Sequence, residues 1–221
     1  MEYLSITTTA VHRSDIIEKT YQTLTSNISG IDYKKLTLYI NVDPLPPQNL
    51  NQKDEIKKVC ESFFGKVVIN FPETPSFAKA VKWCWQQVDS EYVFHIEDDW
   101  KFLEKININD YLKLFNDTVY QVAFRAYPGK YNKMVLSPSL LKNEVCKKIS
   151  ENLDETINPE VQLRGKKFGL NMPIGDKPTD KIICPSKQIN ISDMGRKWLA
   201  STKYRKSDKH GKSHFNSWIE K

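Results

Sequence analysis

The sequence has no long hydrophobic run, and this absence excludes a membrane-spanning helix. Its longest apolar stretches are a handful of residues, whereas a helix that crosses a bilayer needs roughly 20. The chain also starts without the basic region and apolar core of a secretory signal. We therefore expect a cytoplasmic protein, which would lie in the host cytoplasm if the chain is viral, and any membrane contact would be peripheral.

Cysteine is scarce, and the motifs of several large enzyme classes are missing. The cysteines stand too far apart for a CxxC metal pair or a dense disulfide framework, so we expect buried free thiols in a reducing compartment. They are Cys60, Cys84, Cys146 and Cys184. No Walker loop, GxSxG, HExxH or GxGxxG is present, so ATPases, α/β-hydrolases, zincins and dinucleotide enzymes have no motif support.

The composition is that of a globular protein, with 221 residues of which 39% are hydrophobic. This length supplies one full core but not two large domains. We predict a single domain, 1–221, in two lobes at 1–100 and 101–194, followed by a basic segment at 195–221. That segment holds eight basic and two acidic residues, which equals the whole net charge of +6. It could bind a phosphate-rich partner, or it could be a solvated tail.

Strands and helices alternate through the first hundred residues. Short β-branched runs predict strands, and apolar residues at helical spacing predict helices. The predicted strands are 3–9, 36–42, 66–71 and 92–96, and the predicted helices are 14–30, 51–64 and 77–88. Apolar residues of the last helix form one stripe that we assign to the core: Phe77, Ala80, Val81, Cys84, Trp85 and Val88. This alternation indicates a doubly wound α/β sheet.

The second half is less regular. We predict strands near 119–126 and 133–136, and helices near 108–115, at 139–149 and from Pro159 onward.

Three consecutive carboxylates, Glu97, Asp98 and Asp99, follow the apolar strand at 92–96. Ligands of open α/β sheets bind beyond the carboxyl ends of the strands, and this is such an end. Like charges so close together repel unless a cation offsets them, and Mg²⁺ or Mn²⁺ accepts carboxylate oxygens while leaving positions for phosphates. The acids therefore indicate a metal-diphosphate site, although an acidic turn is the structural alternative.

These residues resemble the GT-A fold of nucleotide-sugar glycosyltransferases. The resemblance lies in the strand ending at Asp43, the helix that carries residues 77–80, and the run from Glu91 to Trp100, whose Glu-Asp-Asp looks like the DxD motif of family 2-like members. It implies a GT-A (Rossmann-like), mostly parallel central sheet flanked by helices. It also implies a nucleoside-diphosphate sugar as donor, a UDP-sugar being expected, with Mn²⁺ or Mg²⁺ as cofactor.

The resemblance also assigns roles to single residues. It implies that Asp99 binds the metal, that Glu97 or Asp98 addresses the ribose or sugar, and that Asp43 contacts the nucleotide base. The family's usual Asp-Asp-Gly-Ser after the second strand is replaced here by Asp43-Pro44.

Further donor contacts are expected from the ends of the chain. The stretch from Thr8 to Arg13 matches the family's nucleotide-binding loop, where a hydroxyl such as that of Thr8, or the guanidinium of Arg13, would meet base or phosphate. Arg196 and the lysines beyond it could close over the diphosphate and stabilise its leaving charge.

A general base should come from the second half of the chain. Glu160 lies in the first turn of the helix that Pro159 begins, a position resembling that of the base in inverting members of the family. Asp154 and Glu155 are rival candidates, and compensation of the helix dipole is a purely structural explanation for Glu160.

The four histidines receive different interpretations. His95 lies inside an apolar strand and is assigned to the core, whereas His12 is a surface or phosphate-loop candidate. His210 and His214 stand four residues apart, and His214 could complete the metal coordination of Asp99, as a late histidine does in many GT-A enzymes. A solvated basic tail is the alternative for both.

The sequence thus predicts a metal-dependent glycosyltransferase that works by direct, inverting displacement. Its acceptor would be either a hydroxymethylated base in DNA, reached through the basic segment, or a glycan. Two other functions stay open: a nucleotidyltransferase, which would usually want a glycine-rich loop that is missing near the first strand, and a non-enzymatic nucleic-acid-binding module.

Overall fold

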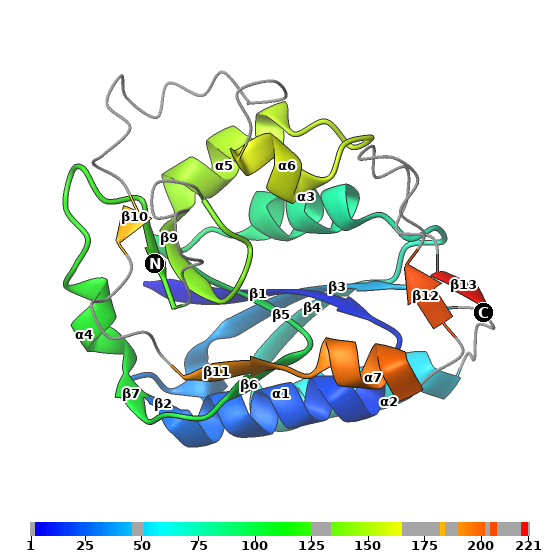
Figure 1. Ribbon diagram of the computed structural model, residues 1–221. Helices are drawn as coiled ribbons and strands as arrows, with labels where there is room; N and C mark the ends of the chain where they lie inside the picture. The colour runs from blue at the N-terminus through cyan, green and yellow to red at the C-terminus, as the bar shows by residue number, and fades with distance from the viewer. Residues whose placement is uncertain are drawn as a thin grey trace.

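The computed structural model describes residues 3–45, 51–124, 134–164, 182–183, 190–201, 204–206 and 218–220. Its centre is a seven-stranded sheet with the order β10-β8-β9-β5-β1-β3-β4 (Figure 1). The strands are β1 (Leu4–Val11), β3 (Thr37–Asp43), β4 (Lys66–Asn70), β5 (Tyr92–Glu97), β8 (Gln121–Ala123), β9 (Ser139–Lys142) and β10 (Ile182–Ile183).

The sheet is mostly parallel and reverses its order beside β1. Strand β1 pairs in parallel with β3 on one side and with β5 on the other, and β9 alone runs antiparallel to its neighbours. The chain proceeds outward from β1 to β3 and β4, then returns to β5 on the opposite side of β1. A crevice is expected where such a reversal occurs, beyond the carboxyl ends of β1 and β5.

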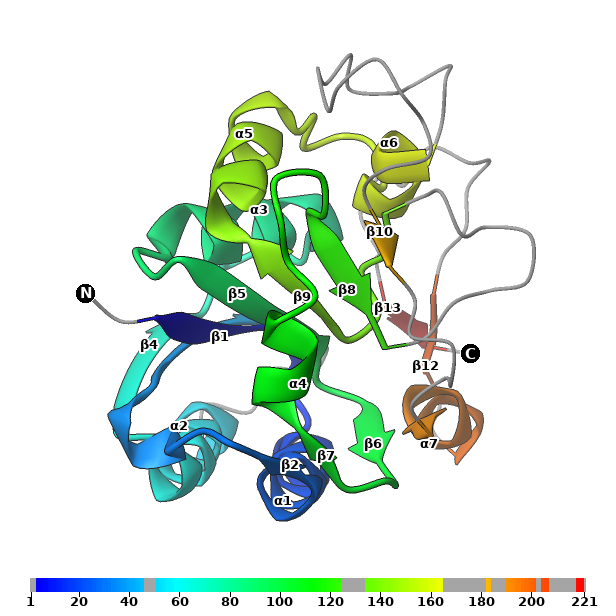
Figure 2. The same cartoon turned by 90° about the vertical axis from the view of Figure 1, so that its left-hand side faces the viewer.

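Helices cover both faces of the sheet (Figure 1 and Figure 2). Helices α1 (Ser14–Asn27) and α2 (Asn51–Phe63) lie on one face, and α3 (Phe77–Gln87), α5 (Asn143–Asn152) and α6 (Pro159–Arg164) lie on the other. Two apolar clusters fill the space between the sheet and the helices on its two faces. The first includes Tyr21, Leu24, Ile56, Phe64 and Phe94, and the second includes Val81, Trp85, Leu141, Val145 and Ile149.

Shorter elements complete the described chain. Strand β2 (Ile28–Ser29) pairs with β7 (Ile106–Asn107), β6 (Trp100–Phe102) with β11 (Ile191–Asp193), and β12 (Tyr204–Lys206) with β13 (Trp218–Glu220). The remaining elements are the 3₁₀ helix η1 (Tyr33–Lys35), α4 (Ile108–Leu112) and α7 (Gly195–Ser201). None of the helices in this part of the chain is long and apolar enough to cross a membrane.

The alternation predicted for the first hundred residues is confirmed, and so is the mostly parallel α/β sheet flanked by helices. The helix predicted at 139–149 is wrong in its first turn. Residues 139–142 form β9, because Leu140 and Leu141 bury their side chains on opposite faces of the sheet, and α5 begins only at Asn143. A short apolar run of this kind fits either structure by periodicity alone.

Three smaller predictions also need correction. Residues 134–136 are buried but form no strand, β8 is confined to 121–123, and α4 ends at Leu112. The first of these segments is held by side chains instead, since the amide of Gln121 bonds the backbone of Val135 in both directions. Cys60, Cys84 and Cys146 are buried free thiols as predicted, and Cys184 lies outside the described residues.

Candidate functional site

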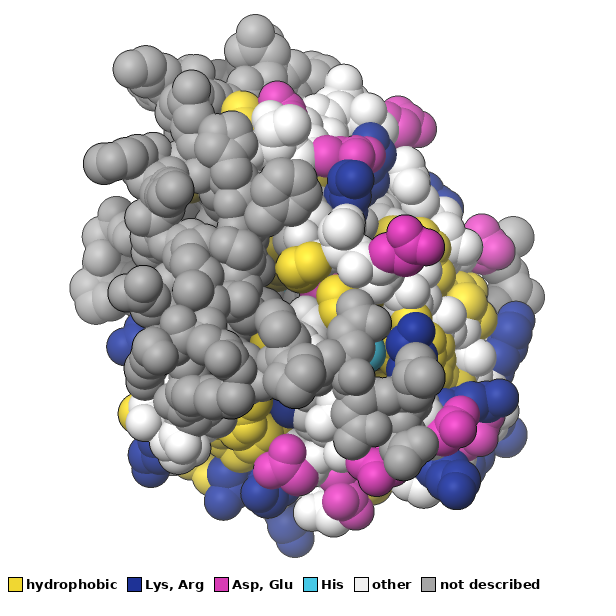
Figure 3. All heavy atoms as spheres, turned by 90° about the vertical axis from the view of Figure 1, so that its right-hand side faces the viewer, with side chains coloured by type: hydrophobic (Ala, Val, Ile, Leu, Met, Phe, Trp, Pro, Cys, Tyr) yellow, Lys and Arg dark blue, Asp and Glu magenta, His cyan; other side chains and the backbone are white. Residues whose placement is uncertain are grey.

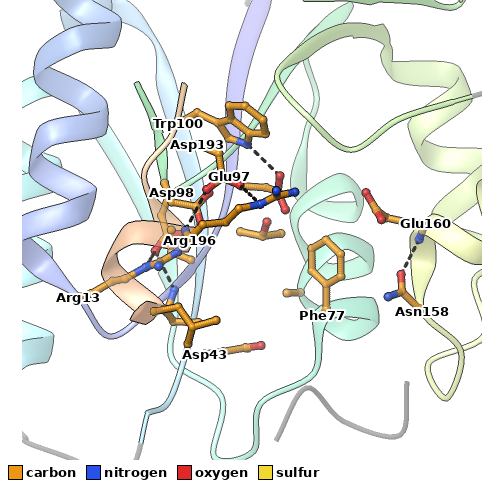
Figure 4. A pocket seen from close by; sticks show the side chains of 17 residues that line it. Arg13, Asp43, Phe77, Glu97, Asp98, Trp100, Asn158, Glu160, Asp193 and Arg196 are labelled. Atoms are coloured by element: carbon orange, nitrogen blue, oxygen red, sulfur yellow. Dashed lines mark hydrogen bonds and ion pairs between the residues drawn. The ribbon is translucent and has the colours of Figure 1, made fainter. Parts of the chain in front are cut away.

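A pocket of about 440 Å³ opens where β1 and β5 end, at the reversal of strand order (Figure 4). One wall comes from the strand ends and from α7, and the opposite wall comes from α3 and the start of α6. The lining residues from β1 to α3 are Thr9, Ala10, Val11, Arg13, Asp43, Phe77 and Ala80. Those from β5 onward are Glu97, Asp98, Asp99, Trp100, Asn158, Glu160, Asp193, Gly195, Arg196 and Leu199.

Arg13 joins two of the three consecutive acids. Its Nε donates to Oδ2 of Asp98 at 2.8 Å, and its Nη2 donates to Oδ1 of Asp98 at 2.6 Å and to Oδ2 of Asp99 at 2.8 Å. Burial lowers the pKa of Arg13, but the attraction of Asp98 and Asp99 outweighs it and the pKa is raised. The guanidinium is therefore a permanent cation inside the acidic cluster.

The carboxylate of Asp98 is occupied by hydrogen bonds from Arg13 and from the backbone. The backbone N–H of Val11 donates to its Oδ2 at 3.1 Å, so both carboxylate oxygens already accept hydrogen bonds. The side chain is 4% exposed, compared with 20% for that of Asp99. Burial, and next the charge of Asp98, raise the pKa of Asp99. Of this pair, Asp99 is the acid that a ligand in the pocket can reach more readily.

Glu97 is the last residue of β5, and its side chain lies on the same face of the strand as that of His95, because alternate residues of a strand point in the same direction. Its Oε2 accepts a hydrogen bond from Nε1 of Trp100 at 2.9 Å. His95 lies below it on the same face, fully buried, with Nδ1 within 2.9 Å of Thr7 Oγ1 and 3.3 Å of Trp85 Nε1. Its full burial confirms the assignment of His95 to the core, and burial also lowers the pKa of the ring to about 3.

A distant part of the chain closes the acidic wall. Strand β11 pairs with β6, and beyond it the N–H of Met194 donates to the carbonyl of Asp99 at 2.8 Å. Gly195 faces the carboxylate of Asp99 so closely that a Cβ at this position would collide with Oδ2. Next along α7, the ring of Trp198 lies 4.9 Å from Cζ of Arg13.

This segment also brings Arg196 to the pocket, and its role at the diphosphate stays a prediction. The Nε of Arg196 lies 3.2 Å from Oδ2 of Asp193, while its side chain remains 85% exposed. Asp193 and Gly195 were not singled out from the sequence. No local signal identifies them, because their partners Trp100 and Asp99 lie in a separate part of the chain.

Glu160 lines the opposite wall of the pocket. Asn158 lies immediately before α6, and its Oδ1 accepts the N–H of Glu160 at 2.9 Å. The adjoining loop is held by the buried side chain of Gln162, whose Nε2 donates to the carbonyls of Asp154 and Ile157 at 2.8 and 2.7 Å. These contacts fix the helix start that carries the carboxylate.

The two rival bases are placed elsewhere. Asp154 is exposed and accepts hydrogen bonds from the side chain and the N–H of Thr156, which lower its pKa. Glu155 pairs with Lys82 at 2.9 Å on the surface. Neither residue lines the pocket, whereas Glu160 does.

Asp43 reaches the pocket from the end of β3 and anchors the helix behind it. Its Oδ1 accepts Nδ2 of Asn41 at 2.8 Å, and its Oδ2 accepts the N–H of Ser76, the N-cap of α3, at 2.9 Å. Burial raises the pKa of Asp43 to about 6, against the opposing effect of these hydrogen bonds.

Two residues of the predicted nucleotide loop lie elsewhere than expected. Thr8 is fully buried on the α1 side of the sheet, where its Oγ1 accepts the hydroxyl of Tyr21 at 3.0 Å, and Thr9 lines the pocket instead. His12 is 4% exposed rather than a surface residue, because its ring packs edge-on against Phe71. Burial, and next the charge of Lys53, lower the pKa of His12. His210 and His214 lie outside the described residues.

The chemistry of the lining partly fits a divalent cation. Carboxylate oxygens are the ligands that Mg²⁺ and Mn²⁺ prefer, and Asp99 offers one at the mouth of the acidic wall. Within the described ranges, however, no group of three or more His, Cys, Asp or Glu side chains is arranged to hold a metal by itself. A cation bound here would need oxygens from its substrate as well, as is usual for Mg²⁺ at phosphate sites.

Comparison with solved structures identifies the fold. A mannosyltransferase of Pyrobaculum calidifontis, PcManGT, in complex with GDP-Man and Mn²⁺, matches 73% of this chain and 49% of its own with a TM-score of 0.53 and 11% identity. A 1–349 fragment of TarS from S. aureus, in complex with UDP-GlcNAc, matches 73% of this chain and 51% of its own with a TM-score of 0.52 and 15% identity. The chain thus spans about half the length of these glycosyltransferases and shares their fold.

A nucleotidyltransferase is also similar. A cytidylyltransferase from Leptospira borgpetersenii matches 85% of this chain and 78% of its own, with a TM-score of 0.50 and 8% identity. No protein-family model matches the sequence, and no curated protein matches it. The likeness therefore defines the GT-A-like α/β class of the fold, with a mostly parallel sheet flanked by helices.

Proposed function

We propose that this chain is a glycosyltransferase that moves a sugar from a nucleoside-diphosphate sugar to an acceptor hydroxyl. The observation that carries the proposal is one pocket at the strand-order reversal with Asp99 on one wall and Glu160 on the other. The first wall suits a cation-bound diphosphate, and the second suits a general base. The fold shared with two glycosyltransferases supports the same class of reaction.

The charge of the pocket limits how a diphosphate can bind. Six acidic residues and two arginines line it, so a diphosphate would be repelled unless cations accompany it. We propose Mn²⁺ or Mg²⁺ as that cation, held by Asp99, because Asp98 is occupied by Arg13. When bound, the ion would neutralise the charge of the diphosphate.

The donor would then lie along the strand ends. Asp43 and the end of β1 would face the nucleotide base, with a UDP-sugar as the expected donor. Arg13 and Arg196 would face the diphosphate, and Glu97 would face the sugar. These assignments require Asp98 to act by holding Arg13 rather than by contacting ribose or sugar.

The proposed reaction is a direct displacement. The carboxylate of Glu160 accepts the proton of the acceptor hydroxyl as the oxygen forms a bond to the anomeric carbon. The bond from that carbon to the diphosphate oxygen breaks, and its electron pair leaves with the nucleoside diphosphate. Because attack and departure occur on opposite faces of the sugar, the configuration inverts.

A glycan hydroxyl is the acceptor in this proposal. The alternative, a hydroxymethylated base in DNA, depends on the basic segment 195–221, of which only 195–201, 204–206 and 218–220 are described. On the face drawn in Figure 3, the described acidic and basic side chains are interspersed rather than grouped by sign. Within the described part of this face, the charges form no single-sign surface that would favour a polyanion.

A nucleotidyltransferase is a second candidate, because the similarity to the cytidylyltransferase covers more of both chains. In that reaction a sugar phosphate would attack a nucleoside triphosphate and pyrophosphate would leave. The products distinguish the two proposals: a glycosyltransferase releases a nucleoside diphosphate from a nucleotide sugar, and a nucleotidyltransferase releases pyrophosphate.

Calorimetric titration tests the donor site directly. UDP, and then GDP, would be titrated into wild-type protein and Asp99→Ala, with and without Mn²⁺. We expect metal-dependent binding that Asp99→Ala loses and that Glu160→Gln, the matched acid on the other wall, retains. Absence of binding by every nucleoside diphosphate would contradict the glycosyltransferase proposal, and pyrophosphate release from CTP with a sugar phosphate would favour the alternative.

A further inference from the structure

Phe77 places an aromatic ring inside the acidic pocket. The stripe at helical spacing assigned Phe77 to the core, but its side chain is only half-buried and lines the pocket. In Figure 4 the ring lies between the acidic residues that end β5 and Glu160 on α6. A group attached to the diphosphate would meet the proposed general base, Glu160, in this part of the pocket.

The ring is held in a fixed position. Phe77 is the first residue of α3, and Ser76 caps that helix by accepting the N–H of Lys79 at 3.3 Å. The N–H of Ser76 in turn donates to Asp43, so the helix start is tied to the end of β3. The inner part of the ring packs against the apolar cluster that contains Val81 and Trp85.

The other aromatic side chains nearby differ from Phe77. Trp100 also lines the pocket, but it is 4% exposed and its indole N–H donates a hydrogen bond to Glu97. Trp83 is half-buried on α3 and packs against the same cluster, yet it does not line the pocket. Among the described lining residues, Phe77 therefore offers the accessible aromatic surface.

An apolar ring face in a polar pocket requires a ligand that is itself apolar on one side. A pyranose ring fits this requirement, because its hydroxyls point outward from its edge while C–H bonds cover part of its faces. A phosphate offers no such face, and the nucleotide base, which does, is assigned to Asp43 and the end of β1 in the proposed donor site. Binding pockets commonly combine aromatic surface of this kind with a few polar groups that set orientation.

We propose that Phe77 is the platform for the transferred sugar, which is a pyranose with at least one face of C–H bonds. This inference rests on the proposed function. One face of the sugar lies on the ring, and its anomeric carbon is thereby held between the diphosphate and Glu160. Phe77 thus determines which nucleotide sugars bind well, and it does not act on the nucleotide itself.

The test compares binding of a nucleoside diphosphate with binding of its pyranose sugar. For the nucleotide that wild type binds, Phe77→Ala should weaken the nucleotide sugar by about tenfold and the bare diphosphate by less than about twofold. Phe77→Tyr should retain wild-type affinity, and Phe77→Leu should fall between. Trp83→Ala, which removes a half-buried aromatic ring from the same helix, should leave the ratio of the two affinities unchanged.

Each outcome has one meaning. Equal losses for diphosphate and nucleotide sugar in both Phe77→Ala and Phe77→Leu, or no loss for either ligand, would overturn the platform while leaving the glycosyltransferase proposal intact. Failure of wild type to bind any nucleoside diphosphate would overturn the proposed function and the platform with it. Thermal melting of each variant establishes that the protein measured is folded, and Phe77→Tyr provides a folded comparison if Phe77→Ala is unstable.

Discussion

The guanidinium of Arg13 spans both carboxylate oxygens of Asp98, at 2.8 and 2.6 Å, and reaches Asp99 with the same Nη2. The pair is almost fully buried, with 6% and 4% of the two side chains exposed. Sharing of one cation by two neighbouring acids gives those acids different roles. Asp98 holds Arg13 in place, and Asp99 remains the more exposed carboxylate beside the pocket.

This division predicts different effects for two neighbouring substitutions. Asp98→Ala leaves a buried guanidinium short of its partner and should destabilise the fold by about 3–5 kcal/mol. Asp99→Ala removes a single charge-assisted hydrogen bond to Arg13 and should cost less, about 1.5–3 kcal/mol, while abolishing metal-dependent nucleotide binding. Urea denaturation and calorimetry measure the two quantities. Equal stability losses in the two variants would contradict the division of roles.

Asp43 should make the stability depend on pH. Because burial raises its pKa from 3.8 to about 6, the folded protein binds this proton more tightly than the unfolded chain does. The contribution is complete below pH 3.8, and it is lost as the pH rises through about 6, by up to roughly 3 kcal/mol.

Asp43→Asn isolates this effect, because Asp99, whose pKa is also raised, remains in the variant. Urea denaturation of both proteins between about pH 3 and about pH 7, a range that spans both pKa values, should show a fall in unfolding free energy that is smaller in Asp43→Asn. Identical pH profiles would show that the raised pKa of Asp43 does not cause the fall in unfolding free energy.

Gly195 should tolerate no side chain. In Gly195→Ala the new Cβ would collide with Oδ2 of Asp99, so either Asp99 or α7 must move. We expect nucleotide affinity to fall by about tenfold, because either movement displaces the carboxylate of Asp99 relative to the ligand. Ala200→Ser, at an exposed position of the same helix, is the control and should bind as wild type does. Normal binding by Gly195→Ala would show that the contact is not required.

Glu160 and Glu155 provide a matched test of the catalytic base. Glu160→Gln should reduce the rate of sugar transfer by about 100-fold or more and leave donor binding unchanged. Glu155→Gln removes a surface ion pair with Lys82 and should change stability by less than about 1 kcal/mol, with no effect on the rate. A rate loss in Glu155→Gln but not in Glu160→Gln would reverse the assignment.

Periodicity was sufficient to predict the strands β1, β3, β4 and β5 and the helices α1, α2 and α3 between them. Strand β1 is a short run rich in β-branched residues and β5 is a short, mostly apolar run, and their order along the chain follows from alternation with amphipathic helices. The acids at the end of β5 were recognisable because three like charges directly after a buried strand need an explanation. These features are local in the sequence.

What could not be predicted depends on pairing between distant segments. No pattern reveals that the N–H of Met194 bonds Asp99, or that Gly195 must lack a Cβ. The same limit explains why the position of Phe77 at the pocket was not predicted. Its helical spacing is that of a core residue, although its ring lies at the edge of the core beside the pocket. The short strand β9 was missed because Leu140 and Leu141 suit a helix equally well.

The docking of β11 and α7 on the acidic strand end also has a consequence for folding. A contact between residues so far apart must close a long loop, and the entropy of that closure delays it relative to the pairing of β1 with β3. The sheet can therefore assemble before the acidic wall is complete, and the wall can open while the sheet stays folded. Ligand affinity would then depend on the local opening equilibrium of the segment that contains β11 and α7. Hydrogen exchange at the N–H of Met194 would measure this opening separately from global unfolding.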